Sequence, residues 1–448
     1  MKEKDLFKKY DVPAPRYTSY PTVPYWELGP TTEEWIDSLH KAFEKSTASW
    51  AMYLHLPFCE TLCTFCGCNT TITKNHKRED GYISLIHNEF ARYLEKIPQL
   101  RKRPLEELHL GGGTPTFFSP ENLKNLLSPL LNQLTLSDKI ERSIEVDPRR
   151  TTADHLRALR EIGFNRVSMG VQDFDPEVQR LVNRIQPFEV TANLTREARS
   201  QGFSSVNYDL IYGLPKQTDV SMLATVEKTV KLRPDRIALY SYAHVPWIKP
   251  AQRLFTEADL PSGAQKRHLY ELSRKVLMDA GYVEIGMDHF ALPTDSLYIA
   301  DKNRELHRNF MGYTSRRTDV LLGLGVSSIS ETPSCFHQNE KVLNVYERRV
   351  AAKEIPTSRG HKLNAEDIEA REQILSLMTK FETTLVDAQI DDIKSFLKPL
   401  LEDGLVRLEG KKLSITDAGR PFLRNACMAL DRRLRRKAPE TKIFSRAL

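Results

Sequence analysis

Cysteine is scarce in this chain, and so are long apolar runs and any strong excess of charge. The 448 residues include six cysteines, and no stretch reaches the about 18 consecutive apolar residues typical of a membrane span. The N-terminal residues, MKEKDLFKKYD, lack the apolar region of a secretory signal, so we expect a cytoplasmic protein. The formal net charge of +6 is too mild to imply nucleic acid and suits an acidic small substrate.

The composition otherwise resembles that of soluble globular proteins. Hydrophobic residues make up 40% of the chain and charged residues 28%, which excludes disorder as the main state. At about 100–200 residues per domain, the length predicts two to four domains, or one barrel with additions.

Strand and helix patterns alternate between residues 50 and 250. Six such repeats predict a parallel α/β sheet, either doubly wound or curled into a barrel. Glycine and polar residues follow the strands (GGGTPT, EVDP, GVQDF, DLIYGLP), at the end of the sheet where such folds bind ligands. The predicted strands are 51–56, 107–110, 143–146, 166–169, 206–212 and 236–242, and the predicted helices between them are 80–96, 119–133, 152–162, 188–201 and 219–232.

Changes in pattern divide the chain into four segments. Residues 1–48 are a proline-rich N-terminal strap, with a helix over 32–43 that begins at Thr31 or Thr32 and has Glu34 in its first turn. Residues 49–250 are the α/β core, and 251–360 an extension that completes the active site. Residues 361–448 form a mostly helical domain, in which two helices precede a hairpin around Gly410 and suggest a winged-helix-like fold.

Four of the six cysteines lie within ten residues, directly after the first predicted strand. Cys59, Cys63 and Cys66 have the spacing C-x3-C-x2-C, which lets one loop place three thiolates around one metal centre. Iron–sulfur clusters take such soft ligands, and three of them leave the fourth iron open.

Other interpretations of these cysteines stay open. With Cys68 as a fourth ligand the site would be a closed zinc or electron-transfer centre, and the thiols could instead be redox-active. Four cysteines in so short a span argue against simple packing. Cys335 and Cys427 are isolated, and we interpret both as structural.

The cysteine motif, with Phe65 directly before its third cysteine, resembles that of the radical S-adenosylmethionine (SAM) superfamily. The GGGTPT segment (111–116) resembles the glycine-rich motif of that superfamily. From about residue 10 to the C-terminus the chain also resembles the oxygen-independent coproporphyrinogen III oxidase family of haem biosynthesis. The most specific segments are PRYTSYPT (15–22) and CxxxCxxCGCN (59–69). The others are EVDPR (145–149), GFNRVSMGVQDF (163–174), VQRLVNR (178–184), DLIYGLPKQT (209–218), GMDHFA (286–291), HRNF (307–310) and FSR (444–446).

This resemblance implies a partial (β/α)6 barrel with an N-terminal strap and a winged-helix-like C-terminal domain. It implies a [4Fe–4S] cluster on Cys59, Cys63 and Cys66, with Cys68 nearby, and two SAM molecules. Residues implied to contact the cluster-bound SAM are Tyr53, Gly112, Glu145 and Ile329, of which Tyr53, Glu145 and Ile329 are the candidate catalytic residues. Residues implied to contact the second SAM are Phe65, Gly113, Thr114, Gln172, Arg184, Asp209 and Ala243.

Each of these polar and apolar residues also has a purely structural interpretation. Glu145 and Asp209 follow strands and could cap helices. Arg184 could be a surface charge, and Ile329 could belong to the core.

The implied reaction is reductive cleavage of SAM, followed by removal of a hydrogen from the β-carbon of a propionate by the 5′-deoxyadenosyl radical. Loss of CO2 and one electron leaves a vinyl group, and two propionates of coproporphyrinogen III react to give protoporphyrinogen IX. The resemblance further implies an external electron donor, a terminal electron acceptor and a monomer. Arg16, Arg149 and Arg308 are candidates for binding propionates, and PRYTSYPT is either a lid or a structural strap. Some relatives have Gln where this chain has Met311, so a role assigned to that Gln does not transfer.

Three rival functions remain. A haem chaperone of the same superfamily typically has C-x3-C-x-Y-C-x-F and lacks PRYTSYPT, whereas this chain has the oxidase form of both. The winged-helix-like domain and the basic run 432–437 suggest nucleic-acid binding, but such a run is more often a solvated face. A plain iron–sulfur electron carrier would not cleave SAM.

Overall fold

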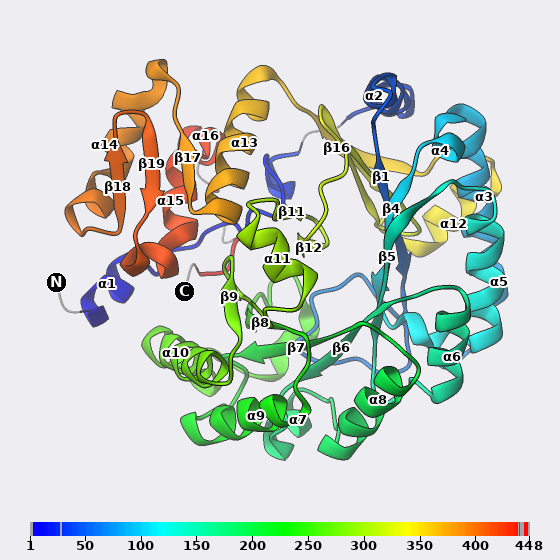
Figure 1. The fold of residues 1–448 in the computed structure, drawn as a ribbon, viewed down its shortest axis with the longest axis horizontal. Coiled ribbons are helices and arrows are strands. Elements are labelled where there is room, and N and C mark those ends of the chain that lie inside the picture. The colour runs from blue at the N-terminus through cyan, green and yellow to red at the C-terminus, as the bar shows by residue number, and fades with distance from the viewer. Residues whose placement is uncertain (1–2, 27–28, 438, 440–442, 447–448) are drawn as a thin grey trace.

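A twelve-stranded sheet forms the frame of the larger part of the molecule (Figure 1). The structure is a computed structural model that describes residues 3–26, 29–437, 439 and 443–446. The sheet order is β16-β15-β14-β13-β1-β4-β5-β6-β7-β8-β10-β9, and the seven strands from β13 to β8 are mutually parallel. These seven are β13 (Val320–Leu324), β1 (Trp50–Leu56), β4 (Leu105–Gly112), β5 (Leu136–Val146), β6 (Arg166–Gln172), β7 (Ser205–Tyr212) and β8 (Arg236–Ser241).

The six predicted strands and the helices between them are confirmed. The helices lie along the outer side of the curved sheet (Figure 1). In α5, for example, Ser119 caps the first turn by accepting from Asn122 N–H, and Leu123, Leu126 and Leu127 are buried against the sheet. The helices of this layer are α3 (Arg78–Lys96), α4 (Gln99–Lys102), α5 (Pro120–Leu131), α6 (Ala153–Glu161), α7 (Pro176–Leu181), α8 (Phe188–Ser200), α9 (Asp219–Leu232) and α10 (Gly263–Asp279).

Segments after residue 280 extend both edges of the parallel sheet. At the β8 edge, β10 (His289–Ala291) and β9 (Val283–Ile285) add antiparallel strands. At the β1 edge, β13 pairs in parallel with β1, opposing Gly323 to Tyr53. Antiparallel strands β14 (Ile329–Thr332), β15 (Cys335–Asn339) and β16 (Thr357–Lys362) continue that edge. The remaining elements of this region are α11 (Ser296–Lys302), the hairpin β11 (His307–Asn309) and β12 (Gly312–Thr314), and α12 (Leu343–Ala351).

The C-terminal residues form a separate helical layer with a small three-stranded sheet. The predicted hairpin around Gly410 is present, with β18 (Val406–Glu409) antiparallel to β19 (Lys412–Ile415) and β17 (Glu382–Thr384) on its other side. Gly410 has φ +57, a left-handed conformation that suits glycine in a tight turn. The helices are α13 (Ala365–Lys380), α14 (Ile390–Glu402), α15 (Leu423–Leu430) and α16 (Arg432–Arg436).

The N-terminal segment packs into this C-terminal layer. After α1 (Glu3–Tyr10), the side chains of Tyr10, Ala14, Tyr17 and Tyr20 belong to the same apolar cluster as α13, α14 and α15. Pro13 also forms a β-bridge with Arg446 near the other end of the chain. Farther along, α2 (Thr32–Glu44) has the capping box expected of Thr31 and Glu34. In the part of the chain that the structure describes, no helix has the length and apolarity needed to cross a membrane.

Candidate active site

A cavity of about 340 Å³ opens where the parallel strands end, and the cysteine loop forms one of its walls. Cys59, Cys63, Cys66 and Cys68 all line it. The loop leaves β1 through β2 (Phe58–Cys59) and returns through β3 (Thr71–Ile72), which pairs in parallel with β2. This short pairing closes the loop, so that its thiols face the same space as the glycine-rich segment after β4.

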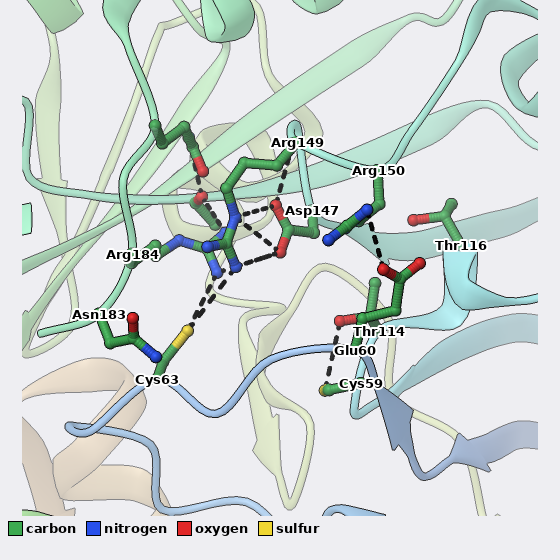
Figure 2. Close-up of polar contacts among 12 residues, drawn as sticks. Cys59, Glu60, Cys63, Thr114, Thr116, Asp147, Arg149, Arg150, Asn183 and Arg184 are labelled. Atoms are coloured by element: carbon green, nitrogen blue, oxygen red, sulfur yellow. Dashed lines mark hydrogen bonds and ion pairs between the residues drawn. The ribbon is translucent and has the colours of Figure 1, made fainter. Parts of the chain in front are cut away.

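The three thiols of the C-x3-C-x2-C motif have different polar neighbours. Cys59 Sγ lies 3.3 Å from Thr114 Oγ1. Cys63 Sγ accepts from Arg149 Nη2 and Arg184 Nη1, each at 3.7 Å (Figure 2). Cys66 Sγ accepts from the backbone N–H of Cys68 at 3.4 Å. All four cysteines of the loop are free, so each thiol remains available as a ligand.

These donors fit a cubane cluster better than a single metal ion. Within the described ranges, no group of three or more His, Cys, Asp or Glu side chains is arranged to hold one ion. A [4Fe–4S] cluster instead takes each thiolate on a separate iron, and three thiols spread around one cavity suit that requirement. The hydrogen bond between Cys66 and Cys68 lowers the pKa of the Cys66 thiol to about 6, whereas burial raises that of Cys59 to about 11. Cys59 would therefore depend on a bound metal for its deprotonation.

A buried cluster of ion pairs lies against Cys63, the middle cysteine of the motif. Asp147 accepts from Arg149 Nε at 3.0 Å and Nη2 at 2.7 Å, and from Arg184 Nη1 at 3.3 Å (Figure 2). The side chains of Asp147 and Arg184 are only 8% and 9% exposed. Burial alone would raise the pKa of Asp147, but Arg184 and Arg149 together hold it below its ordinary value. Two guanidinium groups thus stay fixed beside Cys63, within hydrogen-bonding distance of its sulfur.

Packing accounts for all three glycines after β4. A Cβ on Gly111 would lie 3.0 Å from the Glu145 carboxyl, and one on Gly113 would lie 2.6 Å from the Pro57 carbonyl carbon. Gly112 has φ +111, and a Cβ there would lie 2.6 Å from the His55 ring. The segment therefore approaches the cysteine loop and Glu145 more closely than any other residue type permits.

Two carboxylates, Glu145 on β5 and Asp209 on β7, face the cavity with opposite pKa shifts. Glu145 accepts from Gly112 N–H at 3.1 Å and lies 3.5 Å from His109 Nε2. Burial opposes ionisation of Glu145, but His109 and the Gly112 N–H outweigh it and lower its pKa. Asp209 is hydrogen-bonded to Ser168 and Asn207, and burial together with the charge of Glu145 raises its pKa to about 6. Glu145 is thus an anion at neutral pH, while Asp209 exchanges its proton close to that range.

The structure brings most of the predicted site residues to this cavity. Its lining includes Cys59, Cys63, Cys66, Phe65, Gly112, Gly113, Thr114, Glu145, Gln172, Arg184 and Asp209. Gln172 has φ +67, a conformation uncommon for a residue other than glycine.

Tyr53 and Ala243 lie next to the cavity lining. The Tyr53 ring stacks on that of His109, with centroids 6.0 Å apart, and its hydroxyl is 3.0 Å from His55 Nδ1. Ala243 is linked to the cysteine loop through Gln252, whose amide donates to the carbonyls of both Ala243 and Phe65.

Ile329 is not among the residues that line the cavity. Its side chain packs in a small apolar cluster with Trp26, Phe310 and Phe336, while its backbone lies against Gly323, the register partner of Tyr53.

The arginines named as propionate candidates are spread over the same region. Arg149 lines the cavity, but its guanidinium is held by Asp147. Arg308 lies 4.4 Å from the centroid of the Tyr313 ring, which lines the cavity together with Met311. Arg16 donates to Ser241 O at 2.6 Å and lines a second cavity of about 410 Å³ between α1, α10 and the C-terminal layer.

The sequence analysis did not identify the site residues His55, His109, Ser168 and Asn207. It also did not predict that Asp147 forms ion pairs with two arginines of the site. For two of the four residues a signal was present: His55 and Asn207 are polar residues in otherwise apolar strands, two residues from Tyr53 and Asp209, respectively. Alternate residues of a strand point to the same face, so these two side chains had to share a face with Tyr53 and Asp209.

Comparison with known proteins agrees with this geometry. The model of the radical SAM superfamily matches residues 53–229. The oxygen-independent coproporphyrinogen III oxidase of Escherichia coli is 40% identical over 454 residues, covering 99% of this chain and 98% of that protein. The enzyme of the same name from Pseudomonas aeruginosa is 41% identical over 451 residues, 96% of each chain. The chain belongs to the oxygen-independent coproporphyrinogen III oxidase family.

A solved structure of this family supports the same conclusion for the fold. The coproporphyrinogen III oxidase of E. coli, described as a radical SAM enzyme, superposes with a TM-score of 0.89 at 39% identity, covering 94% of this chain and 98% of that one. The expected radical SAM α/β fold is thereby confirmed. Membership of this oxidase family makes the chain a radical SAM enzyme and implies a [4Fe–4S] cluster and SAM.

Proposed function

We propose that this chain converts two propionates of coproporphyrinogen III into vinyl groups, giving protoporphyrinogen IX without oxygen. The observation that carries the proposal is the cavity in which the three motif thiols face Gly112, Glu145 and Asp209. Full-length similarity to named oxidases supports the choice of substrate.

Cys59, Cys63 and Cys66 would hold the cluster, and Arg149 and Arg184 would donate hydrogen bonds to the Cys63 sulfur. When bound, the cluster and SAM supply the radical that abstracts hydrogen from the substrate. Gly112 would leave room for the methionine part of SAM, and the Glu145 carboxylate would accept hydrogen bonds from its ammonium or ribose hydroxyl groups. Tyr53 would contact the cluster-bound SAM, with its ring oriented by His55. Burial lowers the pKa of His55 and favours its neutral form. Because Asn69 O can only accept from His55 Nε2 (2.9 Å), Nδ1 of the neutral ring accepts a hydrogen bond from the Tyr53 hydroxyl, which fixes both rings.

A second SAM would lie on the other side of the same cavity. Phe65, Gly113, Thr114, Gln172, Arg184, Asp209 and Ala243 are the residues assigned to it. An ionised Asp209 would pair with an ammonium group, and Arg184 with a carboxylate. We further propose that the chain uses an external electron donor and a terminal electron acceptor, and that it works as a monomer in the cytoplasm. Ile329 would pack against the adenine of the cluster-bound SAM. The adenine would then have to reach the apolar cluster that contains Ile329.

An anaerobic assay tests the function. Reconstituted protein is mixed with SAM, dithionite and coproporphyrinogen III, and porphyrin products and 5′-deoxyadenosine are quantified. We expect both protoporphyrinogen and 5′-deoxyadenosine from the wild type, and neither from Cys63→Ala. Cys335→Ala is the matched control, because Cys335 is a free, buried cysteine outside the loop. SAM cleavage without decarboxylation, repeated with an electron acceptor added, would contradict the assigned substrate. Haem binding with neither product would favour the chaperone.

A further inference from the structure

Exposed apolar side chains gather around the cysteine loop. In the described ranges, twelve large hydrophobic side chains are exposed. Six of these lie on the loop or beside segments bonded to it, each between 41% and 66% exposed. We call this surface the loop face. It consists of Leu62, Ile72, Ile185, Trp247, Ile248 and Val342.

Three hydrogen bonds hold the other segments of the loop face against the cysteine loop. Asn183 Nδ2 donates to Leu62 O at 2.7 Å, which places Ile185 beside the loop. Lys249 Nζ donates to Cys68 O at 2.9 Å, which brings Trp247 and Ile248 to it. Asn69 Nδ2 donates to Lys341 O at 2.9 Å, which brings Val342 to it. The loop face is therefore continuous with the backbone that carries the cysteines.

Positive charge surrounds this apolar surface. Lys74, Lys77, Lys249 and Lys341 belong to the same segments, and none forms an ion pair with a described residue. Three of the neighbouring carboxylates are paired with arginines, whereas Asp80 and Glu189 form no ion pair with a described residue. Glu60 pairs with Arg150 at 2.8 Å, Glu340 with Arg349 at 3.0 Å and Glu347 with Arg78 at 3.1 Å. The loop face thus presents an apolar centre with a cationic rim, a pattern typical of a protein interface.

We propose that the loop face is the docking site of an acidic one-electron carrier protein. The proposal rests on the proposed function, in which each SAM cleavage consumes one electron from outside. In the transfer step the carrier is oxidised by one electron and the cluster is reduced by one, with no bond made or broken. Electron transfer is fastest over short distances, and this surface includes the backbone of the cysteine loop itself. Ile185, Trp247, Ile248 and Val342 do not line the cavity, so the porphyrinogen would not cover them.

Binding measurements test the docking site separately from catalysis. The reconstituted holoprotein is titrated with two acidic probes, a flavodoxin and a plant-type ferredoxin, and Kd is measured by thermophoresis. The variants are Trp247→Ser and the double reversal Lys77→Glu/Lys341→Glu. Matched controls on α14 are Phe396→Ser, which is 49% exposed against 46% for Trp247, and Lys394→Glu.

We expect at least one probe to bind the wild type, and Trp247→Ser to weaken that binding by about tenfold or more, as for a central aromatic anchor. The double reversal should weaken it by about tenfold at low salt and abolish its salt dependence, since the Debye length falls to about 3 Å at 1 M salt. The two controls should remain within about twofold of the wild type. Iron content and turnover with dithionite, which needs no docking partner, should be unchanged in all variants.

Three results would contradict the proposed docking site. The first is that neither probe binds at low salt, and the second is that the α14 control variants weaken binding as much as the loop-face variants. The third is that the chain forms a dimer that Trp247→Ser dissociates. Failure of wild-type turnover with dithionite would instead contradict the proposed function.

Discussion

Replacing Asp147 by Asn should destabilise the protein measurably, because it removes the carboxylate that two arginines share. Asn keeps the shape of the side chain but leaves Arg149 and the 9% exposed Arg184 without a counter-charge. Removing one partner of a buried ion pair costs about 3–5 kcal/mol. With about 2.1 cal/mol/K of unfolding entropy per residue, the 448 residues give about 0.9 kcal/mol/K, so a loss of about 3 kcal/mol lowers Tm by about 3 °C.

Calorimetry of the metal-free protein measures this shift, and Asp154→Asn is the matched control. Asp154 pairs with Arg157 at 2.7 Å, but their side chains are 67% and 62% exposed, respectively. Such a pair contributes about 0–1 kcal/mol, so the Tm of Asp154→Asn should lie less than about 1 °C below that of the wild type.

The effect of Asp147→Asn should also depend on pH. Because the folded-state pKa of Asp147 lies below its unfolded value, the contribution of Asp147 to the free energy of unfolding is present above about pH 4 and is lost as the pH falls through the folded-state pKa. Equal Tm shifts for the two variants, or a difference that grows on acidification, would refute the reasoning.

Three further changes test two features of the site and one buried carboxyl group of the surrounding core. Gly112→Ala places a methyl group on the His55 ring at a positive φ, so SAM affinity should fall more than tenfold (roughly 1.4 kcal/mol) in equilibrium dialysis. Gly67→Ala in the same loop meets no atom within 4 Å and should bind SAM normally. Cys63→Ala should lose iron and sulfide on reconstitution, whereas Cys68→Ala should retain them. Buried Glu89, whose pKa burial raises to about 7, favours folding when protonated, so wild-type Tm should fall relative to Glu89→Gln as the pH rises from about 4.3 to 7.

Each of these has an outcome that would contradict it. Normal SAM binding by Gly112→Ala would mean that the glycine segment moves aside without cost. Equal iron loss from Cys68→Ala and Cys63→Ala would favour the alternative interpretation, in which Cys68 is the fourth ligand of a closed metal centre. A pH-independent difference in Tm would show that Glu89 stays ionised within its hydrogen bonds to Gly325, Asn339 and Tyr346.

Local patterns predicted what depends on neighbours in sequence. The apolar runs located all six core strands, and Thr31 with Glu34 located the start of α2, because strand burial and helix capping are set within a few residues. The contact between Asp147 and Arg184 could not be predicted, since the two are 37 residues apart and meet only through the order of the strands. The parallel pairing of β13 with β1 likewise joins segments far apart in sequence, since Trp50 is the register partner of Val320.

The glycine segment shows the same limit. The motif GGGTPT marked its importance, but only packing against Glu145, His55 and Pro57 explains why each of the three positions excludes a side chain. Ile329 is the opposite case. It was named through a resemblance alone, and its neighbours are Trp26, Phe310 and Phe336.

The packing of the N-terminal segment against α13–α15 has a consequence for how the protein is made. Tyr10, Tyr17 and Tyr20 leave the ribosome long before their partners on α15, such as Leu423 and Ala426. All seven parallel strands are also complete before α15, because the last of them in sequence, β13, ends at Leu324. The nascent chain therefore carries exposed aromatic side chains while all the intervening residues are made, and this part of the molecule folds only after α15 has emerged. A ribosome that stalls before α15 produces a finished barrel with an unsatisfied aromatic tail, a natural target for chaperones and proteases.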